Sequence, residues 1–218
     1  MKKLIISDLH IGDLRTEKNL PKVAELIRKK KYDTLILNGD IVDLWLESDE
    51  EKLRNNCVIK AINNVSKEKE VIWVKGNHDD DLDKIIHILP KVTVLNSFLV
   101  TEKKKVILIT HGHQVYPFGN KGLHTKLLYK FIVWFSLHFK IDLQKLGQKN
   151  YFYKKYVKNK RIKLLERQDL DFNSVICGHT HMVDCISHNG KTLFDGGSTA
   201  LTKTYITIED GVISLEKL

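Results

Sequence analysis

Cysteine and proline are scarce in this sequence. The three cysteines, Cys57, Cys177 and Cys185, form no C-x-x-C pair, and their odd number argues against a disulfide framework and against a thiolate zinc site. With three prolines and no Ser/Gly-rich stretch, there is no sign of a linker, a low-complexity tract or an internal repeat. We therefore expect one folded domain over residues 1–218, in a reducing compartment.

Long hydrophobic runs are also missing. The run Leu4–Ile6 ends after three residues, which is too short for the apolar core of a signal peptide. The longest candidate for a membrane segment, residues 131–139, has nine residues, whereas roughly 20 are needed to span a bilayer. We expect a cytoplasmic protein whose closest association with lipid would be peripheral contact with the inner face of the membrane.

Positive charge is concentrated in one region of the chain. The formal net charge is +9, and residues 114–175 alone carry 13 Lys/Arg, 4 Asp/Glu and 12 of the 18 aromatic residues. The remainder is neutral overall. We therefore interpret residues 114–173 as a basic and aromatic insertion within the domain.

Strands and helices alternate in the first half of the chain. Apolar runs at Lys2–Ser7, Thr34–Leu37 and Glu70–Val74 predict buried strands. The amphipathic stretches Glu17–Lys30 and Glu50–Val65 predict helices between them. This order is typical of βαβ units with a parallel sheet.

The second half is richer in strands. A short helix is expected near Leu82–Ile88, and two longer helices are expected in the insertion, at Leu123–Phe139 and Asp142–Arg167. Asn189-Gly190 and Asp210-Gly211 predict hairpin turns. The further predicted strands are Val92–Leu95, Phe98–Thr101, Val106–Thr110, Ser174–Cys177, Met182–Ser187, Lys191–Phe194, Lys203–Ile208 and Val212–Leu215. The fold class is therefore α/β, a mixed core interrupted by a helical insertion.

Five polar clusters follow predicted strands. They read Asp8-Leu9-His10, Gly39-Asp40-Ile41-Val42-Asp43, Gly76-Asn77-His78-Asp79, His111-Gly112-His113 and Gly178-His179-Thr180-His181. Ligands of open α/β sheets bind at the carboxyl ends of the strands, so we expect these side chains to converge. Aspartate, asparagine and histidine without thiolate suit borderline-to-hard divalent cations, and Asp40 could bridge two of them. On extended segments, Asp8 and His10 would point the same way, as would His179 and His181.

Each cluster taken alone has a simpler explanation. Gly39-Asp40 could be a strand-to-helix turn with a helix cap, and Asn77 or Asp79 could cap the following helix. A single histidine such as His111 is commonly structural. Five such clusters in order, each at a strand end, favour a metal site over five coincidences.

Together the clusters resemble the signature of the calcineurin-like metallophosphoesterases. That signature runs D-x-H, G-D-x-x-D, G-N-H-[DE], a single His and G-H-x-H, and here it spans Asp8 to His181. The resemblance implies a four-layer αββα sandwich of two mixed β-sheets. It also implies a phosphohydrolase with two divalent metal ions, manganese first among them and iron, zinc or magnesium as the other candidates.

The resemblance assigns metal ligands by position. The first metal would be held by Asp8, His10, Asp40 and His181. The second would be held by Asp40 as the bridging ligand and by Asn77, His111 and His179. Two cations about 3.5–4 Å apart would stabilise the entering and departing oxygens of an in-line displacement, with a hydroxide between them as nucleophile. Because the ligands bind as neutral imidazoles and ionised carboxylates, activity should fall in acid.

Four further residues receive roles from the same resemblance. His78 would contact the phosphate and act as general acid toward the leaving oxygen, and Asp79 would orient its imidazole. Asp43 and His113 would support the metal ligands through hydrogen bonds rather than bind a metal.

The block Gly39–Trp45 resembles one branch of this superfamily more closely. UDP-2,3-diacylglucosamine pyrophosphatases carry a similar G-D-[IL]-x-[DE]-x-W stretch, and they place a helical lid where this chain has its insertion. That branch usually has Arg in place of His78 and an acidic residue in place of His113. The branch implies a nucleotide-linked or lipid-linked phosphodiester or pyrophosphate as substrate. Its contacts would come from Trp45, Lys121, Phe131, Trp134 and Phe135.

Three uses of the insertion are open. In the first, an apolar lid covers a lipid-linked substrate and lysines face anionic headgroups. This lid would be built from Leu127, Leu128, Phe131, Trp134, Phe135 and Phe139. In the second, the chain is a nuclease or a general phosphodiesterase, and basic residues follow a nucleic-acid backbone. These would be Lys154, Lys155, Lys158, Lys160, Arg161 and Lys163.

In the third use, the helices pack on each other or on a second subunit, and the basic residues form a solvated face. Packing on a second subunit would make the chain a homo-oligomer. A non-enzymatic scaffold is disfavoured, because no expected metal ligand is missing.

Overall fold

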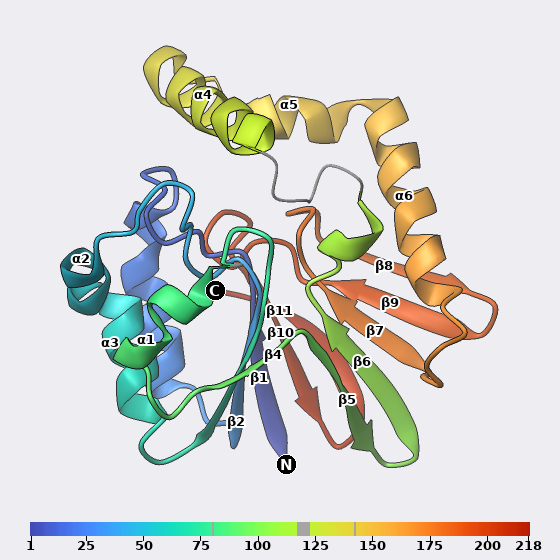
Figure 1. Cartoon of the computed structure of the whole chain (residues 1–218). Coiled ribbons are helices and arrows are strands. Elements are labelled where there is room, and N and C mark those ends of the chain that lie inside the picture. Colours follow the sequence, from blue (N-terminus) through green and yellow to red (C-terminus); the bar gives the residue numbers. More distant parts are fainter. Residues whose placement is uncertain (80, 117–122, 142) are drawn as a thin grey trace.

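The strands form two mixed sheets in the computed structural model, which describes the chain except residues 80, 117–122 and 142 (Figure 1). The six-stranded sheet has the order β11–β10–β1–β2–β3–β4, and the five-stranded sheet has the order β5–β6–β7–β9–β8. The strands of the first sheet are β1 (Lys2–Ile6), β2 (Thr34–Asn38), β3 (Glu70–Val74), β4 (Thr93–Leu95), β10 (Thr204–Glu209) and β11 (Val212–Lys217). Those of the second are β5 (Ser97–Glu102), β6 (Lys105–Thr110), β7 (Ser174–Cys177), β8 (Asp184–His188) and β9 (Lys191–Asp195).

The expected βαβ region is a parallel sheet. β1, β2, β3 and β4 pair in parallel, and the antiparallel strands β10 and β11 extend the sheet beyond β1. In the second sheet β6, β7 and β9 are parallel, and β5 and β8 are antiparallel edge strands. The carboxyl ends of β1, β2, β3, β6 and β7 therefore meet at one edge of the two sheets.

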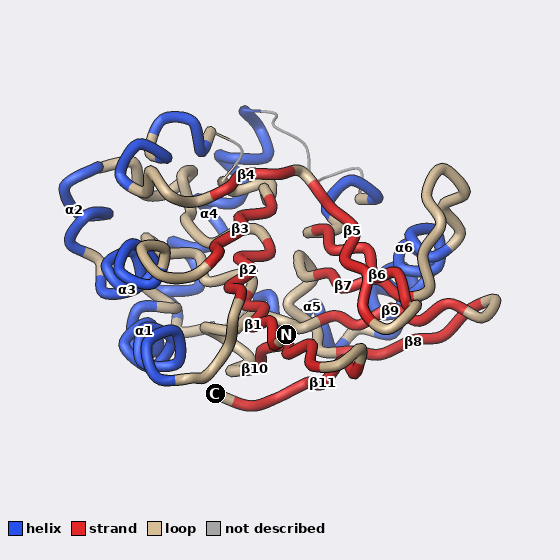
Figure 2. The backbone as a smooth tube through the Cα atoms, turned by 90° about the horizontal axis from the view of Figure 1, so that it is seen from below, coloured by secondary structure: helices blue, strands red, loops and turns tan. Residues whose placement is uncertain are grey.

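Helices cover the outer faces of both sheets (Figure 2). α1 (Leu20–Lys29), α2 (Glu50–Asn55) and α3 (Cys57–Val65) lie beside the first sheet, and α6 (Tyr151–Leu165) lies beside the second. Three apolar cores separate the resulting four layers: one between α1, α3 and the first sheet, one between the sheets and one between α6 and the second sheet. The αββα sandwich is confirmed.

The insertion predicted at residues 114–173 has helices in two different positions. α4 (Leu123–Phe139) and α5 (Leu143–Lys149) lie over the edge where the polar clusters gather (Figure 1). In contrast, Leu164 and Leu165 of α6 are buried against Leu108 and Val175 of the second sheet. α6 is therefore the fourth layer of the sandwich as well as part of the insertion.

Two predicted helices are broken by asparagine. Asn56 has the extended conformation φ −64°, ψ 136° and its side chain caps α3, so the predicted helix Glu50–Val65 is two helices. Asn150 caps α6 in the same way and divides the predicted helix Asp142–Arg167 into α5 and α6. An asparagine side chain can satisfy free backbone N–H groups at a helix start, which a continuous helix would not require. The predicted helix Leu82–Ile88 is a pair of 3₁₀ turns.

Both predicted hairpin turns are confirmed. Asn189 and Gly190 have φ values of 49° and 75°, and Asp210 and Gly211 have φ values of 54° and 77°. Two successive positive φ angles are the requirement of the type I′ turn. Among the described residues, no helix combines the length and the hydropathy that crossing a membrane requires.

Candidate metal centre

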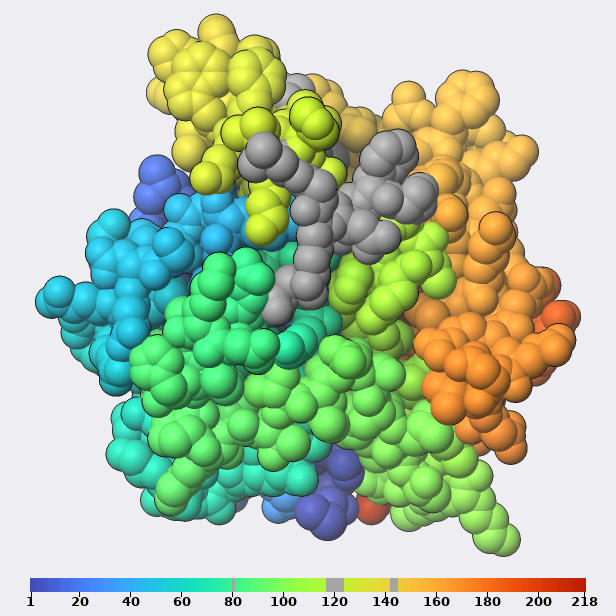
Figure 3. Space-filling view, in the orientation of Figure 1, coloured from blue at the N-terminus to red at the C-terminus, as the bar shows by residue number. Residues whose placement is uncertain are grey.

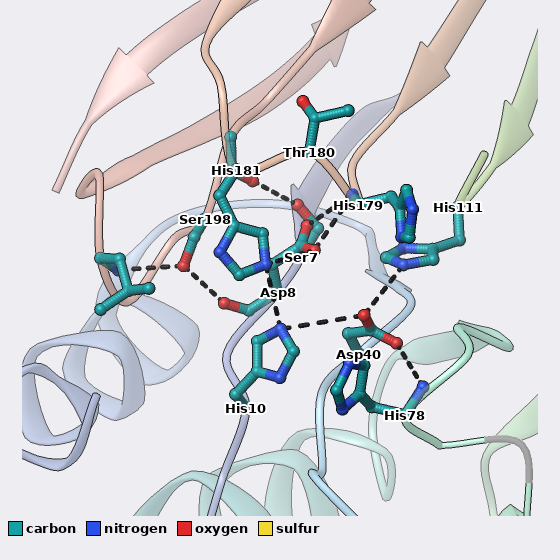
Figure 4. Close-up of polar contacts among 12 residues, drawn as sticks. Ser7, Asp8, His10, Asp40, His78, His111, His179, Thr180, His181 and Ser198 are labelled. Carbon is teal, nitrogen blue, oxygen red and sulfur yellow. Dashed lines mark hydrogen bonds and ion pairs between the residues drawn. The ribbon is translucent and has the colours of Figure 1, made fainter. Parts of the chain in front are cut away.

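The predicted ligands come together at the common edge of the two sheets (Figure 4). Their donor atoms form three groups, and within each group the atoms lie within 4.8 Å of one another. These groups are Asp8, His10 and His181; His10, Asp40 and His78; and Asp40, His111 and His179. The first group holds the expected ligands of the first metal except Asp40, which falls in the other two groups. The third group holds the expected ligands of the second metal except Asn77, which as an amide stands outside this grouping. Asn77 is buried.

Five of these ligands have left-handed backbone conformations. Asp8, His10, Asp40, His179 and His181 have φ values between 47° and 72°. The expectation that each D-x-H or H-x-H pair lies on an extended segment is therefore wrong. Asp8 and His10 both approach His181, but His179 faces His111 and Asp40 instead. Such angles are uncommon outside glycine and concentrate at functional sites, where they aim side chains that a regular strand would not.

Two glycines make room for the carboxylates. A Cβ atom at Gly76 would lie 2.1 Å from Oδ1 of Asp40, and one at Gly178 would lie 2.4 Å from Oδ2 of Asp8. No side chain fits at these separations, so the glycines next to the ligands are required by close approach.

Asp40 lies between the two ligand groups. Its Oδ2 atom is 3.1 Å from Nε2 of His111 and 3.8 Å from Nε2 of His10. On the other side, Nε2 of His181 is 3.0 Å from Nε2 of His10 and 3.2 Å from Oδ1 of Asp8. One carboxylate can thus contribute to both groups, as a bridging ligand must.

The donor set fits divalent cations. Nδ1 of His10 lies 3.0 Å from Asp43 Oδ2, and Nδ1 of His111 lies 2.9 Å from the carbonyl oxygen of Asn38. When these Nδ1 atoms carry the proton, each Nε2 presents a lone pair to the centre. Nε2 of His111 and Oδ1 of Asn77 are buried and make no hydrogen bond. Buried polar atoms are rarely left so, and a cation would satisfy both.

The buried carboxylates of the site also require a compensating positive charge. Burial lowers the pKa of His111, but Asp40 more than offsets it and raises the pKa to about 10. Burial likewise lowers the pKa of His10, and Asp43 and Asp40 raise it to about 9. For His179, burial and the neighbouring His111 lower the pKa to about 3. A divalent cation would supply the compensating charge and allow every imidazole to be neutral.

His78 stands beside the metal ligands. Its backbone N–H donates to Asp40 at 2.8 Å, and its ring packs on Trp45 with 4.0 Å between centroids. The expectation that Asp79 orients this imidazole is wrong, because Asp79 accepts hydrogen bonds from Trp73 Nε1 and from backbone N–H groups instead. The carboxylate that faces His78 is Asp43, whose Oδ1 is 3.1 Å from Nδ1 of the ring.

The remaining predicted residues fall into three positions. Asp43 approaches His10 at hydrogen-bond distance, as expected, and the ring of His113 lies 5.5 Å from that of His111. Phe131 and Trp134 are exposed and Phe135 is half-buried on α4, and none of the three lines the metal cavity. Lys121 lies outside the described residues.

A cavity of about 290 Å³ opens on the metal ligands. α4 contributes Tyr129 and Ile132 to its wall, and the loop after β1 contributes Arg15. The Tyr129 hydroxyl donates to Asp43 Oδ2 at 2.8 Å, and its ring meets His78 edge-on at 4.5 Å. The sequence pattern did not single out Tyr129 or Arg15, because neither belongs to a block at a strand end.

Of two polar residues in the insertion, one was expected elsewhere and the other was not singled out from the sequence. Arg161, expected on a nucleic-acid-binding face, is buried and paired with Asp195. Gln148 of α5 donates to the carbonyl oxygen of Thr180, between His179 and His181.

Behind the site, Ser198 Oγ donates to the carbonyl oxygen of Asp8 at 2.6 Å (Figure 4). The string Gly196-Gly197-Ser198 follows β9 as the five clusters follow their strands, and that position was the available signal.

Similar sequences occur in proteins named as hydrolases or as metallophosphoesterases. The sequence model of the family described as calcineurin-like phosphoesterase matches residues 1–183. The UDP-2,3-diacylglucosamine hydrolase of Psychromonas ingrahamii is 24% identical, over 99% of this chain and 96% of its own length. The enzyme of the same name from Blochmanniella floridana is 26% identical, over 83% of this chain and 80% of its own.

Solved structures with the same fold have lower identity. An archaeal phosphodiesterase aligns over 100% of both chains with a TM-score of 0.53 and 20% identity. The E. coli phosphoesterase Yfce aligns over 98% of this chain and 91% of its own, with a TM-score of 0.52 and 20% identity. The extent of the family match and the arrangement of the five blocks lead to one conclusion: the chain belongs to the calcineurin-like phosphoesterases, which are metal-dependent hydrolases.

Proposed function

We propose that this chain hydrolyses a phosphodiester or pyrophosphate bond at a centre of two divalent metal ions. The position of Asp40 carries this proposal, since its carboxylate lies within 4 Å of imidazoles from both ligand groups. One metal would be held by Asp8, His10, Asp40 and His181, and the other by Asp40, Asn77, His111 and His179. When bound, two such cations stabilise charge on the phosphoryl oxygens and bring the pKa of a water toward neutrality.

His78 and Asp43 take the remaining roles in this proposal. His78 lines the cavity, so its imidazole can donate a proton to the leaving oxygen. Asp43 is within about 3 Å of the Nδ1 atoms of both His78 and His10. It therefore fixes the direction in which each ring presents its Nε2. Arg15 lines the same cavity with its guanidinium paired to Asp13, so this ion pair borders the proposed substrate.

A substrate with more than one phosphate suits the surroundings of this cavity. Arg15 also lines a second pocket of about 370 Å³, in which the other basic residues are Lys18, Lys140, Lys145 and Lys203. Three of these five basic residues come from the part of the chain that is neutral overall. Arg15 pairs with Asp13, and basic side chains gathered in a hollow attract polyvalent anions. A pyrophosphate or a nucleotide is such an anion.

An acylated substrate suits the outer face of α4. Leu127, Leu128, Phe131 and Trp134 are each between 55% and 59% exposed. Figure 3 shows this helix standing out from the body of the molecule. An exposed apolar ridge of this kind commonly contacts lipid or another protein. Together with relatives named UDP-2,3-diacylglucosamine hydrolase, it favours a lipid-linked nucleotide, with the ridge in contact with acyl chains or the membrane surface.

Two assays test the proposal. The full chain with manganese should hydrolyse bis-p-nitrophenyl phosphate, and chelation should abolish the reaction. Under the same conditions it should release UMP from UDP-2,3-diacylglucosamine with a higher kcat/KM than from UDP-N-acetylglucosamine, which lacks the acyl chains. Absence of manganese-dependent hydrolysis would refute the proposed phosphohydrolase activity. Equal kcat/KM for the two nucleotides would refute the lipid-linked substrate, and salt-sensitive cleavage of DNA in its place would identify a nuclease.

A further inference from the structure

The loop that carries His179 and His181 is held from outside by two helices of the insertion. Thr180, between the two histidines, is buried, and its side chain does not line the metal cavity. Gln148 of α5 donates from Nε2 to the carbonyl oxygens of Thr180 and His181, at 3.2 and 3.4 Å. α5 therefore contacts the backbone of the metal-binding loop directly.

Arg161 of α6 holds the same loop through a buried network. Its Nη2 atom donates to Thr180 Oγ1 at 2.9 Å, to the carbonyl oxygen of Met182 at 2.8 Å and to Asp195 Oδ2 at 2.7 Å. Its Nη1 atom donates to Asp184 at 2.5 Å. The side chain is 3% exposed, so these bonds are protected from solvent.

The network is closed through Asp195 at the end of β9. Thr180 Oγ1 donates to Asp195 Oδ2 at 2.8 Å, and the Thr180 hydroxyl accepts from the backbone N–H of Met182 at 3.2 Å. Asp195 is fully buried, so it needs the guanidinium for its charge to be tolerated. Arg161 therefore ties α6, β9 and the metal-binding loop into one unit.

This arrangement matters because the loop is strained. His179 and His181 both have left-handed backbone conformations, with φ of 72° and 53°. Such conformations persist only where neighbouring groups over-determine them. Of the contacts that do so here, Gln148 and Arg161 come from the insertion rather than from the strand β7 that precedes the loop.

We propose that Arg161 and Gln148 are positioning residues of the metal centre, so that the insertion sets the metal affinity through the loop 178–182. Neither residue touches a metal ligand side chain. Outer groups that orient ligands commonly account for ten- to hundredfold in metal affinity. The inference rests on the proposed metal centre, because it assumes that His179 and His181 are ligands.

Calorimetric titration of manganese into the full chain tests the proposal. Gln148→Leu removes both carbonyl contacts at a half-buried position and should weaken manganese binding about tenfold. The melting temperature of the chelated chain should stay within about 2 °C of the wild type. Gln168→Leu, at an exposed position after α6, is the matched control and should change neither quantity.

Arg161→Met should weaken manganese binding at least as much, and Arg161→Lys should restore part of the affinity because a lysine can still pair with Asp195. Arg167→Met, which removes an arginine paired with exposed Asp169, is the control. If Arg161→Met fails to fold, the manganese affinity of Gln148→Leu alone tests the proposal. Manganese affinity within twofold of the wild type in the folded variants would overturn the inference. A wild type that binds no manganese would instead overturn the proposed metal centre.

Discussion

At the scale of single residues, the metal centre depends on the groups that orient its ligands as well as on the ligands. Asp43 is the main example. It faces Nδ1 of His10 and Nδ1 of His78, and it accepts the hydroxyl hydrogen bond of Tyr129. One carboxylate thus joins a metal ligand, the proposed general acid and the helix α4.

Asp43→Asn is predicted to weaken manganese binding by 10- to 100-fold. The two carboxylate oxygens of Asp43 face Nδ1 of His10 and Nδ1 of His78, whereas an amide has only one oxygen that can accept a hydrogen bond. Titration calorimetry measures this affinity. Asp83→Asn, at an exposed carboxylate in the 3₁₀ turn Leu82–Lys84, should bind manganese as the wild type does. Unchanged affinity in Asp43→Asn would show that the ligands hold their geometry without it.

His78→Ala is predicted to affect poor leaving groups more than good ones. A p-nitrophenolate leaves without a proton, whereas an alkoxide needs one, and general acid catalysis contributes about 10²- to 10⁴-fold. The kcat for an alkyl diester should therefore fall at least about 100-fold, and that for bis-p-nitrophenyl phosphate by less than about tenfold. Equal losses for both substrates would indicate that His78 binds the phosphate without transferring a proton.

At the scale of secondary-structure elements, asparagine caps decide where helices begin. Asn56 Oδ1 accepts from the Val58 backbone N–H at 2.9 Å at the start of α3. Asn56→Ala is predicted to lower the free energy of unfolding by about 1 kcal/mol, and Asn56→Asp by much less. Urea denaturation measures both. Asn64→Ala, at an exposed position inside α3, should change the free energy by less than about 0.5 kcal/mol. Equal effects at both positions would refute the capping role.

The sequence predicted elements well where apolar periodicity was uninterrupted. β3, α4 and β7 begin and end at the predicted residues, because buried runs and a long apolar helix leave few alternatives. It failed where one polar side chain competes with the backbone, at Asn56 and Asn150, because a cap and an exposed helical asparagine look alike in a sequence.

The metal ligands were predicted from the polar clusters at strand ends, but the residues that surround these ligands were not. Tyr129, Gln148 and Arg161 act through the packing of the insertion on the core, which no local pattern encodes. Asp43 and Asp79 were both recognised, but which of them faces His78 depends on turns of a few residues. Pattern alone cannot distinguish two carboxylates that each lie five residues beyond the end of a strand, Asp43 after β2 and Asp79 after β3.

At the scale of the whole molecule, the β11 edge of the first sheet is held by a polar cluster as well as by apolar cores. Glu216 of β11 accepts hydrogen bonds from Lys30 after α1, from Tyr205 Oη at 2.8 Å and from Thr207 Oγ1 at 2.7 Å. Burial alone would raise the pKa of Glu216, but these donors outweigh it and lower the pKa to about 2.

This cluster is predicted to make stability depend on pH. The folded-state pKa lies below the unfolded value of 4.5, so the contribution is fully present above that value and is lost as the pH falls toward 2. Because Glu216 is partly exposed, we expect about 1 kcal/mol. Glu216→Gln should lower the urea midpoint at pH 7 and lower it less at pH 3.5. A difference between the urea midpoints of the variant and the wild type that increases at lower pH would contradict the lowered pKa of Glu216.

The central claim is that side chains spread from Asp8 to His181 form one centre for two metal ions. Its most direct test is the stoichiometry of manganese bound to the chelated and reloaded full chain, measured by calorimetry and by elemental analysis. We expect two manganese ions per chain, and fewer than two in Asp40→Asn because the bridging carboxylate is lost. A wild type without stoichiometric manganese, or an Asp40→Asn variant that still binds two ions with unchanged affinity, would contradict it.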